Sequence, residues 1–574
     1  MQNFTITSGG QELIAKMIAG TSTCTFTRLC TSEHDYTDVA DLSTLTALED
    51  IKQSVLISSI SRTDTTLVNL TTQVNNAELT KGYYIRAVGL YAKDIENNEI
   101  LYAVSIETGI ADYLPPFGGK TIRSITYKMN IRVDNSEQVT LEVNPASIPT
   151  MEQVESIQTQ VNTIDEAVSN LKDFVNYNDD FDVYGVEVDF ENKKFTRIGG
   201  AVNKQPGNDF DGINAFGGRR RCNLADDGIV NAYEGDAGYI EDGSNGQVMV
   251  EQPKFYYKVV PLKTETVNGQ TVVRKARYYV SDTAKTGFKV HPAFVINGAE
   301  CNKIYVSAYE ATSYDVSASA YITDDAQTVD FSNDKIASIA GAKPMSGLSQ
   351  NGATRAGFRS IAAKRGTNWS QGLIQTATMT ELLMLIEYAS FNMQANIGRG
   401  CVDKTDDSSS NMAENTGATS PLGNVSGKIV KDGIELVSYR GEENFWGNVW
   451  TWVDGININY GKILIADHNF ADDTPTGYTD TGLTCINANG YVSAFVYSEE
   501  YDWLFIAGEV VGSDALPVSD YFWQNVTQAW TVAILGADWA TASPSGAFCW
   551  RLADVSSYRN RHIGGRAVYR KAAA

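Results

Sequence analysis

Histidine, the side chain that most often serves as a general base or a metal ligand, is rare and scattered in this chain. The four histidines are His34, His291, His468 and His562, and none has another histidine three or four residues away. A zinc site or a Ser-His-Asp triad would draw on such side chains, but no spacing here indicates either. The chain also lacks the glycine-rich loop and lysine that cradle phosphates. The sequence therefore predicts no catalytic residue, no metal ligand and no cofactor.

Cysteine is the second residue type with chemical potential. The chain has seven, widely spaced and without a C-x-x-C pair: Cys24, Cys30, Cys222, Cys301, Cys401, Cys485 and Cys549. An odd, scattered set in a chain of 574 residues argues against a disulfide framework and against structural zinc. We expect reduced thiols, as in a protein made in a reducing cytosol.

Two acidic turns are the remaining candidates for a metal. Asp209 and Asp211 lie in one, and Asp226 and Asp227 in the other. Their carboxylates could supply oxygen ligands to calcium, although the EF-hand spacing is not met. Because Asp and Gly are also common in ordinary turns, we favour plain turns and leave structural calcium open.

The stretch from Leu535 to Tyr569 has the most distinctive pattern in the chain, because large apolar residues alternate with small, polar and charged ones. Surface substitutions usually change stability by within about 0.5 kcal/mol, whereas core truncations cost roughly 2–5 kcal/mol. A surface that changes its side chains therefore needs a buried frame. The predicted frame residues are Trp539, Phe548, Trp550, Leu552 and Ile563.

The order of these residues, W-x6-G-A-F-x-W-x-L-x3-S-S-x5-I-G-G-R, resembles the variable region of proteins targeted by diversity-generating retroelements. In that family AAY codons are mutated at adenine, and Lys, Glu, Gln and Met, which such codons cannot reach, are absent from Leu535 to Ile563. An ordinary lectin-like surface without diversification is the alternative. The resemblance implies receptor-binding variable positions at Ala540, Thr541, Arg551, Ala553, Asp554, Tyr558, Asn560 and His562, with Asp538, Pro544 and Cys549 as weaker candidates.

Three upstream segments, Lys303–Thr312, Thr378–Ala389 and Gly447–Trp452, resemble landmarks of the C-type-lectin fold in its formylglycine-generating-enzyme branch. The resemblance covers about residues 180–574, with a large insertion near 200–250. A capping box at Thr378 and Glu381 predicts a helix over Met379–Ser390. Enzymes of that branch bind copper with a pair of nearby cysteines, but Cys549 has no second cysteine in its segment. One thiol suits Cu(I) poorly, so we expect no enzyme and keep a copper-dependent oxidase as an alternative.

Residues 149–178 carry the clearest helical periodicity. Apolar residues recur there at alternating spacings of three and four, which is the a/d seam of a heptad repeat. The pattern predicts a short coiled coil that joins identical chains, with a trimer preferred from the family resemblance. The alternative is an amphipathic helix packed on its own domain. The seam residues are Val154, Ile157, Val161, Ile164, Val168, Leu171 and Val175.

Residues 1–148 are predicted to be mainly β. Tyr83–Tyr91 and Ile100–Ile106 are rich in strand-forming residues, and Gln11–Ile18 is a candidate short helix. Together with the Tyr113-Leu-Pro-Pro loop, these strands resemble the head-proximal domain of phage tail fibres. That likeness implies docking on a phage tail or baseplate protein, and an unrelated β domain is the alternative.

Charge and hydropathy exclude other partners. The net charge is −23, so the chain lacks the basic face that neutralises nucleic-acid phosphates or an anionic membrane. No apolar run reaches the roughly 18 residues of a membrane span, and no secretory signal is evident. We therefore expect a protein made in the host cytoplasm that leaves the cell as part of a virion, at the tail tip or tail fibre.

These expectations combine into an α+β protein of three parts. Residues 1–148 form a mainly β attachment domain, 149–178 a coiled-coil stalk, and 179–574 a large C-type-lectin-like domain with a variable region at about 535–569. The predicted function is a phage tail-tip receptor-binding protein that contacts a host cell-surface protein or glycan. A structural tail or baseplate protein without receptor contact is the second alternative, beside the oxidase.

Overall fold

The computed structural model describes residues 4–62, 67–118, 122–132, 182–324, 327–347, 352–407 and 410–573. The chain divides into two compact units, Met1–Ile164 and Asp165–Ala574. The heptad residues from Val154 to Val175 lie outside the described residues, so the coiled coil and the homotrimer remain predictions. Strands make up 38% and helices 11%, so the chain is mostly β and the helical share of the expected α+β class is small. No described helix is long and apolar enough to cross a membrane.

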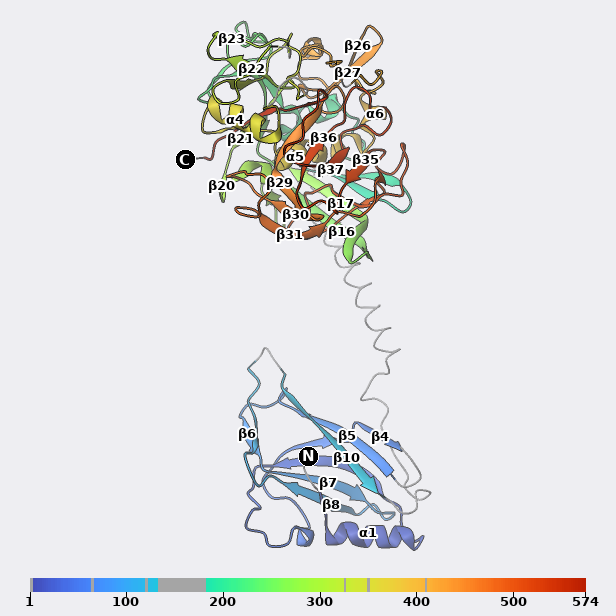
Figure 1. The fold of residues 1–574 in the computed structure, drawn as a ribbon. Coiled ribbons are helices and arrows are strands. Elements are labelled where there is room, and N and C mark those ends of the chain that lie inside the picture. Colours follow the sequence, from blue (N-terminus) through green and yellow to red (C-terminus); the bar gives the residue numbers. More distant parts are fainter. Residues whose placement is uncertain are drawn as a thin grey trace. The chain divides into compact units, whose positions relative to one another are not determined.

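Unit 1 contains a five-stranded antiparallel sheet with the order β1-β8-β7-β2-β3 (Figure 1). Helix α1 (Ser8–Ile18) begins after Thr7, whose hydroxyl accepts a hydrogen bond from the Gly10 amide, and it packs on β8. The predicted short helix and strands are therefore confirmed. The strands are β1 (Thr5–Ile6), β2 (Thr25–Ser32), β3 (Ile51–Leu56), β4 (Ser59–Arg62), β5 (Leu67–Asn75), β6 (Tyr83–Ile85), β7 (Ala87–Lys93), β8 (Glu99–Ile106), β9 (Asp112–Leu114) and β10 (Ser124–Arg132).

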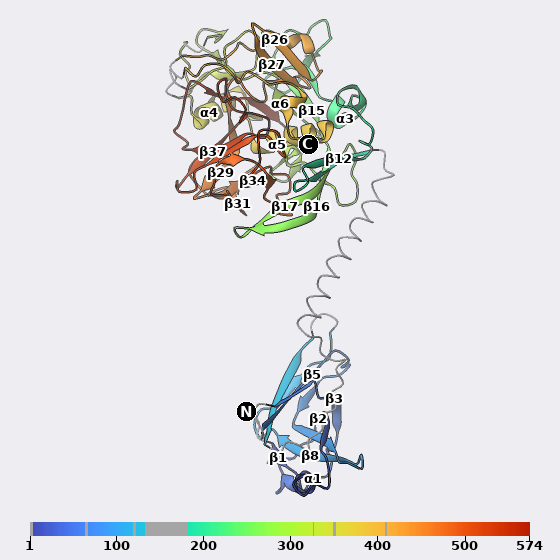
Figure 2. The ribbon, with the colours of Figure 1, turned by 90° about the vertical axis from the view of Figure 1, so that its right-hand side faces the viewer.

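Unit 2 is built on three larger sheets (Figures 1 and 2). The first has the order β12 (Lys194–Gly199), β11 (Val183–Asp189), β17 (Gln270–Ser281), β16 (Tyr256–Val267) and β18 (Lys289–Val290). The second has the order β14 (Val230–Tyr233), β13 (Arg220–Leu224), β15 (Gln247–Pro253), β21 (Lys303–Ser307), β39 (Ala567–Arg570) and β25 (Trp369–Gln371). The third has the order β31 (Thr479–Thr484), β30 (Lys462–Ile465), β29 (Trp450–Asn459), β36 (Thr531–Leu535), β37 (Trp550–Asp554), β35 (Tyr521–Gln524) and β32 (Gly490–Tyr491), with β38 (Ile563–Gly564) beside β29.

Smaller elements complete unit 2. The short strands are β19 (Val295–Ile296), β20 (Ala299–Glu300), β22 (Thr312–Asp315), β23 (Ala320–Tyr321), β24 (Lys335–Ala337), β26 (Gly427–Lys431), β27 (Ile434–Tyr439), β28 (Glu442–Glu443), β33 (Ala494–Phe495) and β34 (Ala507–Glu509). The helices are α3 (Asn214–Gly217), α4 (Arg355–Arg365), α5 (Ile374–Tyr388) and α6 (Met393–Asn396). Strand β39 pairs with both β21 and β25, so the last strand of the chain is hydrogen-bonded on both sides within the second sheet. The segment from Leu535 to Tyr569 is thereby anchored at both ends, in β36 and in β39.

Helix α5 corrects one prediction. It begins at Ile374 rather than Met379, and the Leu373 amide donates to the Thr376 hydroxyl at its start. Thr378 and Glu381 lie inside the helix, so the predicted capping box is wrong. Every residue from Ile374 to Glu387 is buried. A helix that is buried on all sides has no solvent-facing polar side. Its polar residues therefore did not mark the position where the helix begins.

The acidic turns make protein contacts of their own. Asp209 accepts a hydrogen bond from the Gln205 amide, and Asp211 pairs with Arg440 at 3.0 Å. Asp227 accepts from the Ile229 amide, as in an ordinary Asx turn. Within the described ranges, no group of three or more His, Cys, Asp or Glu residues is arranged to hold a metal ion.

Candidate functional site

Strand β37 separates frame residues from variable positions. Trp550 and Leu552 are fully buried, whereas Arg551 and Ala553, which alternate with them, are partly exposed. Successive side chains of a strand point to opposite faces, so the alternation in sequence becomes an inner and an outer surface. Backbone pairing places β37 between β36 and β35, with Trp523 opposite Arg551.

All five frame residues are at most 1% exposed, which is the burial expected of them. Phe548 packs edge-on against Phe391 and Phe505, with ring centroids 4.8 and 5.4 Å apart. The indole nitrogen of Trp550 donates to the Glu381 carboxylate at 2.8 Å. Burial raises the pKa of Glu381 well above its usual range and favours its neutral form. The frame thus connects β37 to the buried helix α5; its role in supporting a binding site remains a prediction.

The variable positions divide into two groups. Eight are partly exposed: Ala540, Thr541, Pro544, Arg551, Ala553, Tyr558, Asn560 and His562. The other three are buried, with exposed fractions of 6% for Asp538, 0% for Cys549 and 8% for Asp554. We call the partly exposed group the variable face.

Cys549 was predicted as a weaker candidate for a receptor-binding variable position, and its burial contradicts that prediction. It lies in the core with Trp450 and Ile534, and burial raises the pKa of its thiol well above the usual range. Its carbonyl also accepts from the Gly536 amide, which ties this stretch to the end of β36. A side chain in this position has no outer surface with which to contact a partner.

The two buried aspartates act from below the variable face. Asp554 pairs with Arg551, the guanidinium Nε lying 2.7 Å from its carboxylate. Asp538 accepts from the Thr541 hydroxyl at 2.7 Å and lies 3.2 Å from Nδ1 of His562. Burial lowers the pKa of His562, although Asp538 opposes this. These contacts hold three exposed side chains, at 541, 551 and 562, in fixed orientations.

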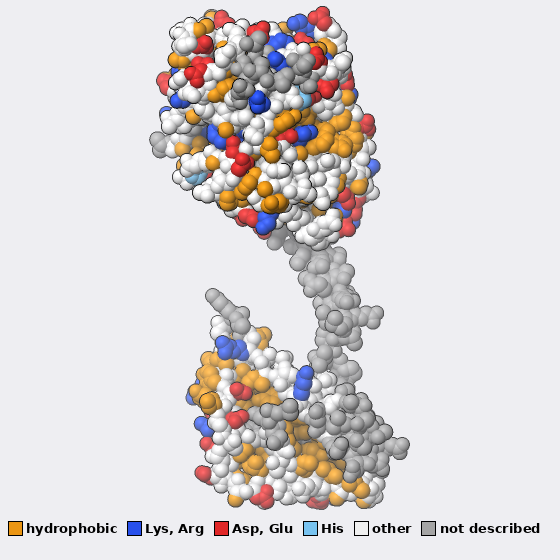
Figure 3. Space-filling model, viewed as in Figure 1, with side chains coloured by type: hydrophobic (Ala, Val, Ile, Leu, Met, Phe, Trp, Pro, Cys, Tyr) orange, Lys and Arg blue, Asp and Glu red, His pale blue; other side chains and the backbone are white. Residues whose placement is uncertain are grey.

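An aromatic row beside the variable face was not recognised in the sequence. It consists of Tyr491, Tyr521 and Trp523, all partly exposed, with ring centroids 5.2 Å apart in the first pair and 4.5 Å in the second. Trp523 packs edge-on against buried Trp450, and the Tyr491 hydroxyl bonds that of Ser543. Figure 3 shows hydrophobic side chains gathered over this part of unit 2. The signal was the buried Phe522 between two exposed rings, which is a strand alternation like that of β37.

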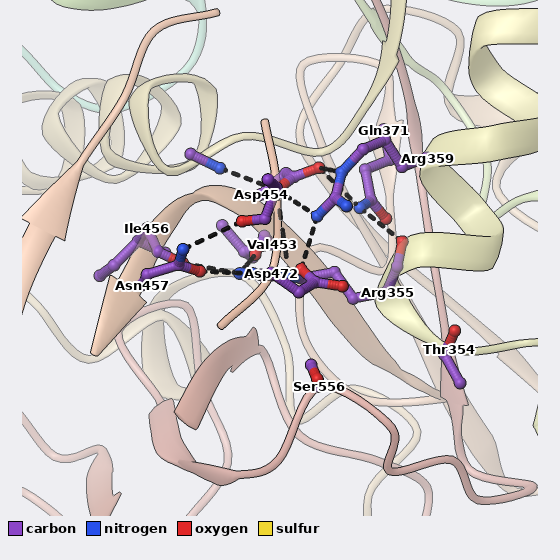
Figure 4. Close-up of polar contacts among 12 residues, drawn as sticks. Thr354, Arg355, Arg359, Gln371, Val453, Asp454, Ile456, Asn457, Asp472 and Ser556 are labelled. Carbon is purple, nitrogen blue, oxygen red and sulfur yellow. Dashed lines mark hydrogen bonds and ion pairs between the residues drawn. The ribbon is translucent and has the colours of Figure 1, made fainter. Parts of the chain in front are cut away.

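A buried network of charged residues supports the loop that follows β37 (Figure 4). Arg355 and Arg359 of α4 contact Asp472, with Nε of Arg355 2.8 Å and Nη2 of Arg359 2.7 Å from its carboxylate. Arg359 also bonds Asp454 of β29 at 2.6 Å. The neighbouring Asp473 accepts from the Ser556 hydroxyl at 2.6 Å. Through this contact the network supports the loop that follows β37 and carries Tyr558.

Two of the landmark segments meet at Glu310. Its carboxylate accepts from the Asn448 side chain at 2.6 Å and from the Val449 amide at 3.2 Å. The group is 1% exposed, and burial raises its pKa to about 7, although Arg566 opposes the shift. Residues 303–312 and 447–452 are therefore joined by a carboxyl group that titrates near neutrality.

Glu310→Gln should flatten the pH dependence of unfolding. The folded pKa of about 7 exceeds the usual 4.5. The carboxyl group's contribution to stability is therefore complete below pH 4.5 and is lost as pH rises through 7. At about 1.4 kcal/mol per pKa unit, the wild type should lose up to about 3 kcal/mol more than the variant across this window. Urea unfolding at pH 4.5 and pH 8 measures the difference. Glu12→Gln, at an exposed site on α1, is the control, and parallel profiles for wild type and Glu310→Gln would contradict the assignment.

Comparison with known proteins leaves the family open. No family model matches this chain, and no curated protein matches it. The similar solved structures include three variants of the Major Tropism Determinant. P3c is 11% identical with a TM-score of 0.21, M1 is 10% identical with 0.24, and U1 is 11% identical with 0.23. The matches cover 61, 62 and 62% of this chain and 71, 72 and 73% of those chains, respectively. Likenesses this weak assign no function, which has to follow from the residues of the site.

Proposed function

We propose that this chain is a phage tail-tip receptor-binding protein whose variable face binds a host cell-surface protein or glycan. The observation that carries this proposal is the separation of buried frame residues from exposed variable positions within one short segment. Such a segment can change its contact residues while its core stays intact, because surface substitutions usually cost little stability. We propose no enzymatic activity for it.

The chemistry of the surface supports a binding role. Tyr, Trp and Arg dominate the energetics of protein interfaces, and here Arg551 lies opposite Trp523 of the aromatic row and is close enough to Tyr558 to interact with it electrostatically. Asp554 orients Arg551, so the planar guanidinium group is ordered before a partner binds. A rigid aromatic and forked-donor surface suits a protein or glycan ligand.

Competition for adsorption tests the proposal. Host cells are incubated with the purified full-length chain before phage are added, and adsorbed particles are counted. We expect the chain to block adsorption at saturating concentration, whereas a chain with an unrelated tip should not. Unchanged adsorption in the presence of cell-bound chain would favour a structural tail or baseplate protein without receptor contact.

We further propose that the variable face is diversified by a retroelement on a C-type-lectin-like scaffold. The test is genomic: a near-copy of the DNA for Leu535–Tyr569 should lie close to a reverse-transcriptase gene and differ only at adenines of the copy. The differences should fall in codons of the variable face, and the codon of buried Cys549 should match. A genome without such a copy would exclude diversification while leaving receptor binding intact.

For assembly, we propose that residues 149–178 form a parallel coiled coil and that residues 1–148 dock on a tail or baseplate protein. Parallel association would point every copy of the variable face the same way. Later contacts then form at high effective concentration, so modest single-site affinity suffices for adhesion. The proposed location is the tail tip or tail fibre of the virion.

The double variant Val161→Glu, Val168→Glu is expected to be monomeric, because two charges at seam positions would have to be buried in the assembly. Multi-angle light scattering of the full chain measures the mass. Gln158→Glu with Asn162→Glu, at polar flanking positions, adds the same charge and should leave the oligomer intact. Oligomers that persist in the seam variant would show that another element joins the chains.

A further inference from the structure

A second surface feature of unit 2 has the size and lining of a small-ligand site. It is a cleft of about 520 Å³, within the range of known ligand pockets. One wall comes from residues 225–247, which belong to a segment near residues 200–250 that is rich in Gly, Asp and Asn. The opposite side comes from the sheet β23-β22-β24 and from the end of α4, which packs on β24; β22, β23 and α4 lie near one another in Figure 1. The cleft shares no residue with the variable face or the aromatic row.

The charges at the cleft leave one cation in excess. Asp226 is contacted by Nζ of Lys335 at 3.0 Å and by Nη1 of Arg365 at 2.5 Å. Arg365 is only 7% exposed and also donates to the Ile336 carbonyl, so its position is set before any ligand binds. Its Nη2 has no hydrogen-bond partner among the described residues. A net positive cleft on a chain of net charge −23 favours an anionic ligand.

The rest of the lining offers an aromatic surface and oxygen atoms that can accept hydrogen bonds from ligand hydroxyls. Tyr314 and Tyr321 meet edge to face with ring centroids 5.0 Å apart. The amide nitrogen of Asn231 donates to the Asn245 carbonyl, and that of Asn245 to the Gly238 carbonyl, both at 2.8 Å. No described residue donates to the side-chain oxygen of either asparagine, so both oxygens are available to ligand hydroxyls.

Backbone geometry shows that this wall is preformed. Gly243 and Gly246 have φ angles of 85° and 115°, which residues that carry a side chain rarely adopt. A Cβ on Gly243 would lie 2.5 Å from the Tyr321 ring, and one on Gly246 would lie 2.7 Å from the Leu224 carbonyl. The Tyr321 hydroxyl donates to the Gly243 carbonyl at 2.9 Å, which holds ring and loop together.

We propose that this cleft binds an acidic sugar residue, with its carboxylate at Lys335, its ring against Tyr314 and its hydroxyls on the two asparagine oxygens. Each part of such a ligand meets a matching group: a carboxylate an excess cation, a sugar face an aromatic ring, and hydroxyls free acceptors. The cleft would give the chain a sugar contact that is separate from the variable face. This inference does not depend on the proposed function of that face.

Calorimetric titration of the full chain with D-glucuronate, D-glucose and inorganic phosphate tests the proposal. Glucuronate should bind saturably and at least tenfold more tightly than either other probe, since only it combines the carboxylate with the sugar ring. Lys335→Gln should weaken glucuronate at least tenfold, and Tyr314→Ala should weaken it several-fold. Lys303→Gln, which removes the same charge from an exposed lysine of β21 outside the cleft, should leave glucuronate binding unchanged.

Three results would overturn the proposal. Absence of saturable glucuronate binding would remove the site. Equal affinity for phosphate would reduce it to a general anion site. An equal loss in Lys335→Gln and Lys303→Gln would show that overall charge, not the cleft, attracts the ligand. Unfolding curves of both lysine variants, expected to coincide with the wild type, show that any loss of binding is not a loss of folding.

Discussion

A chain carrying Ala553→Glu and Tyr558→Ala is expected to lose host adsorption by a factor of about one hundred or more. Tyr558 is the exposed aromatic of the variable face, and aromatic anchors of this kind contribute about 2 kcal/mol or more to binding. Ala553 points outward from β37, so a glutamate there places an unpaired charge on the variable face. Binding of the purified chain to host cells, measured over a concentration series, gives the change in affinity.

Arg551 and His562 are left unchanged in this variant for a structural reason. Arg551 pairs with Asp554 and His562 lies beside Asp538, and both carboxylates are mostly buried. Removing either side chain would leave a buried carboxylate without its partner and would confuse loss of binding with loss of stability. The paired variant should unfold within about 1 kcal/mol of the wild type.

Val430→Glu is the matched control, because it adds the same charge at an exposed position of β26 outside the variable face. It should bind host cells as the wild type does. Adsorption of the Ala553→Glu, Tyr558→Ala chain within a factor of two of this control would place receptor recognition elsewhere on the molecule.

Arg355→Ala is expected to destabilise unit 2 by about 3–5 kcal/mol, as removal of one partner from a buried ion pair does. Its fully buried guanidinium donates to Asp472, to the Asn457 side chain and to the Ile456 carbonyl (Figure 4). Truncation leaves all three acceptors without this donor in the protein interior. Urea unfolding, followed by tryptophan fluorescence, measures the loss.

Arg399→Ala provides the comparison, because it breaks an Arg–Asp pair of the same chemical type on the surface. The Arg399 and Asp403 side chains are 39% and 54% exposed, and water can solvate the charge that remains. Its cost should be about 1 kcal/mol or less. Equal costs for the two variants would mean that the network of Figure 4 contributes no more than a surface pair.

Coupling within the network can be measured directly. A double-mutant cycle of Arg355→Ala and Asp472→Ala should give an interaction energy of about 1–3 kcal/mol, because the two side chains are in contact. The single Asp472→Ala variant should also loosen the loop that contains Ser556, because the Ser556 hydroxyl bonds the neighbouring Asp473. Faster amide exchange in residues 555–562 would report this effect.

Local periodicity explains what could be predicted. Trp550 and Leu552 were expected inside and Arg551 and Ala553 outside from their residue types, and the strand that contains them turns this alternation into two faces. Burial bears out this arrangement. The strands near residues 83–106 were predictable for the same reason, because β-branched and aromatic residues gather there.

The same reasoning failed where neighbours come from distant segments. Cys549 looks like one small residue among others, but the pairing of β36 with β37 places it in the core. Thr378 and Glu381 resemble a helix start, but other elements cover α5 on every side. In both cases burial depends on contacts with residues far away in sequence.

The sequence by itself determined the frame of the C-terminal segment and the side-chain alternation of β37, because both depend on residue type and on a repeat of two. Only the tertiary structure decided that the aromatic row joins the variable face, that Asp538 and Asp554 are turned inward, and that Arg355 and Asp472 support the loop beyond β37. Among these contacts, Trp523 with Arg551 and Arg355 with Asp472 join residues 28 and 117 positions apart. Such pairings follow from the register of distant strands and from the burial of charge, and no local pattern encodes either.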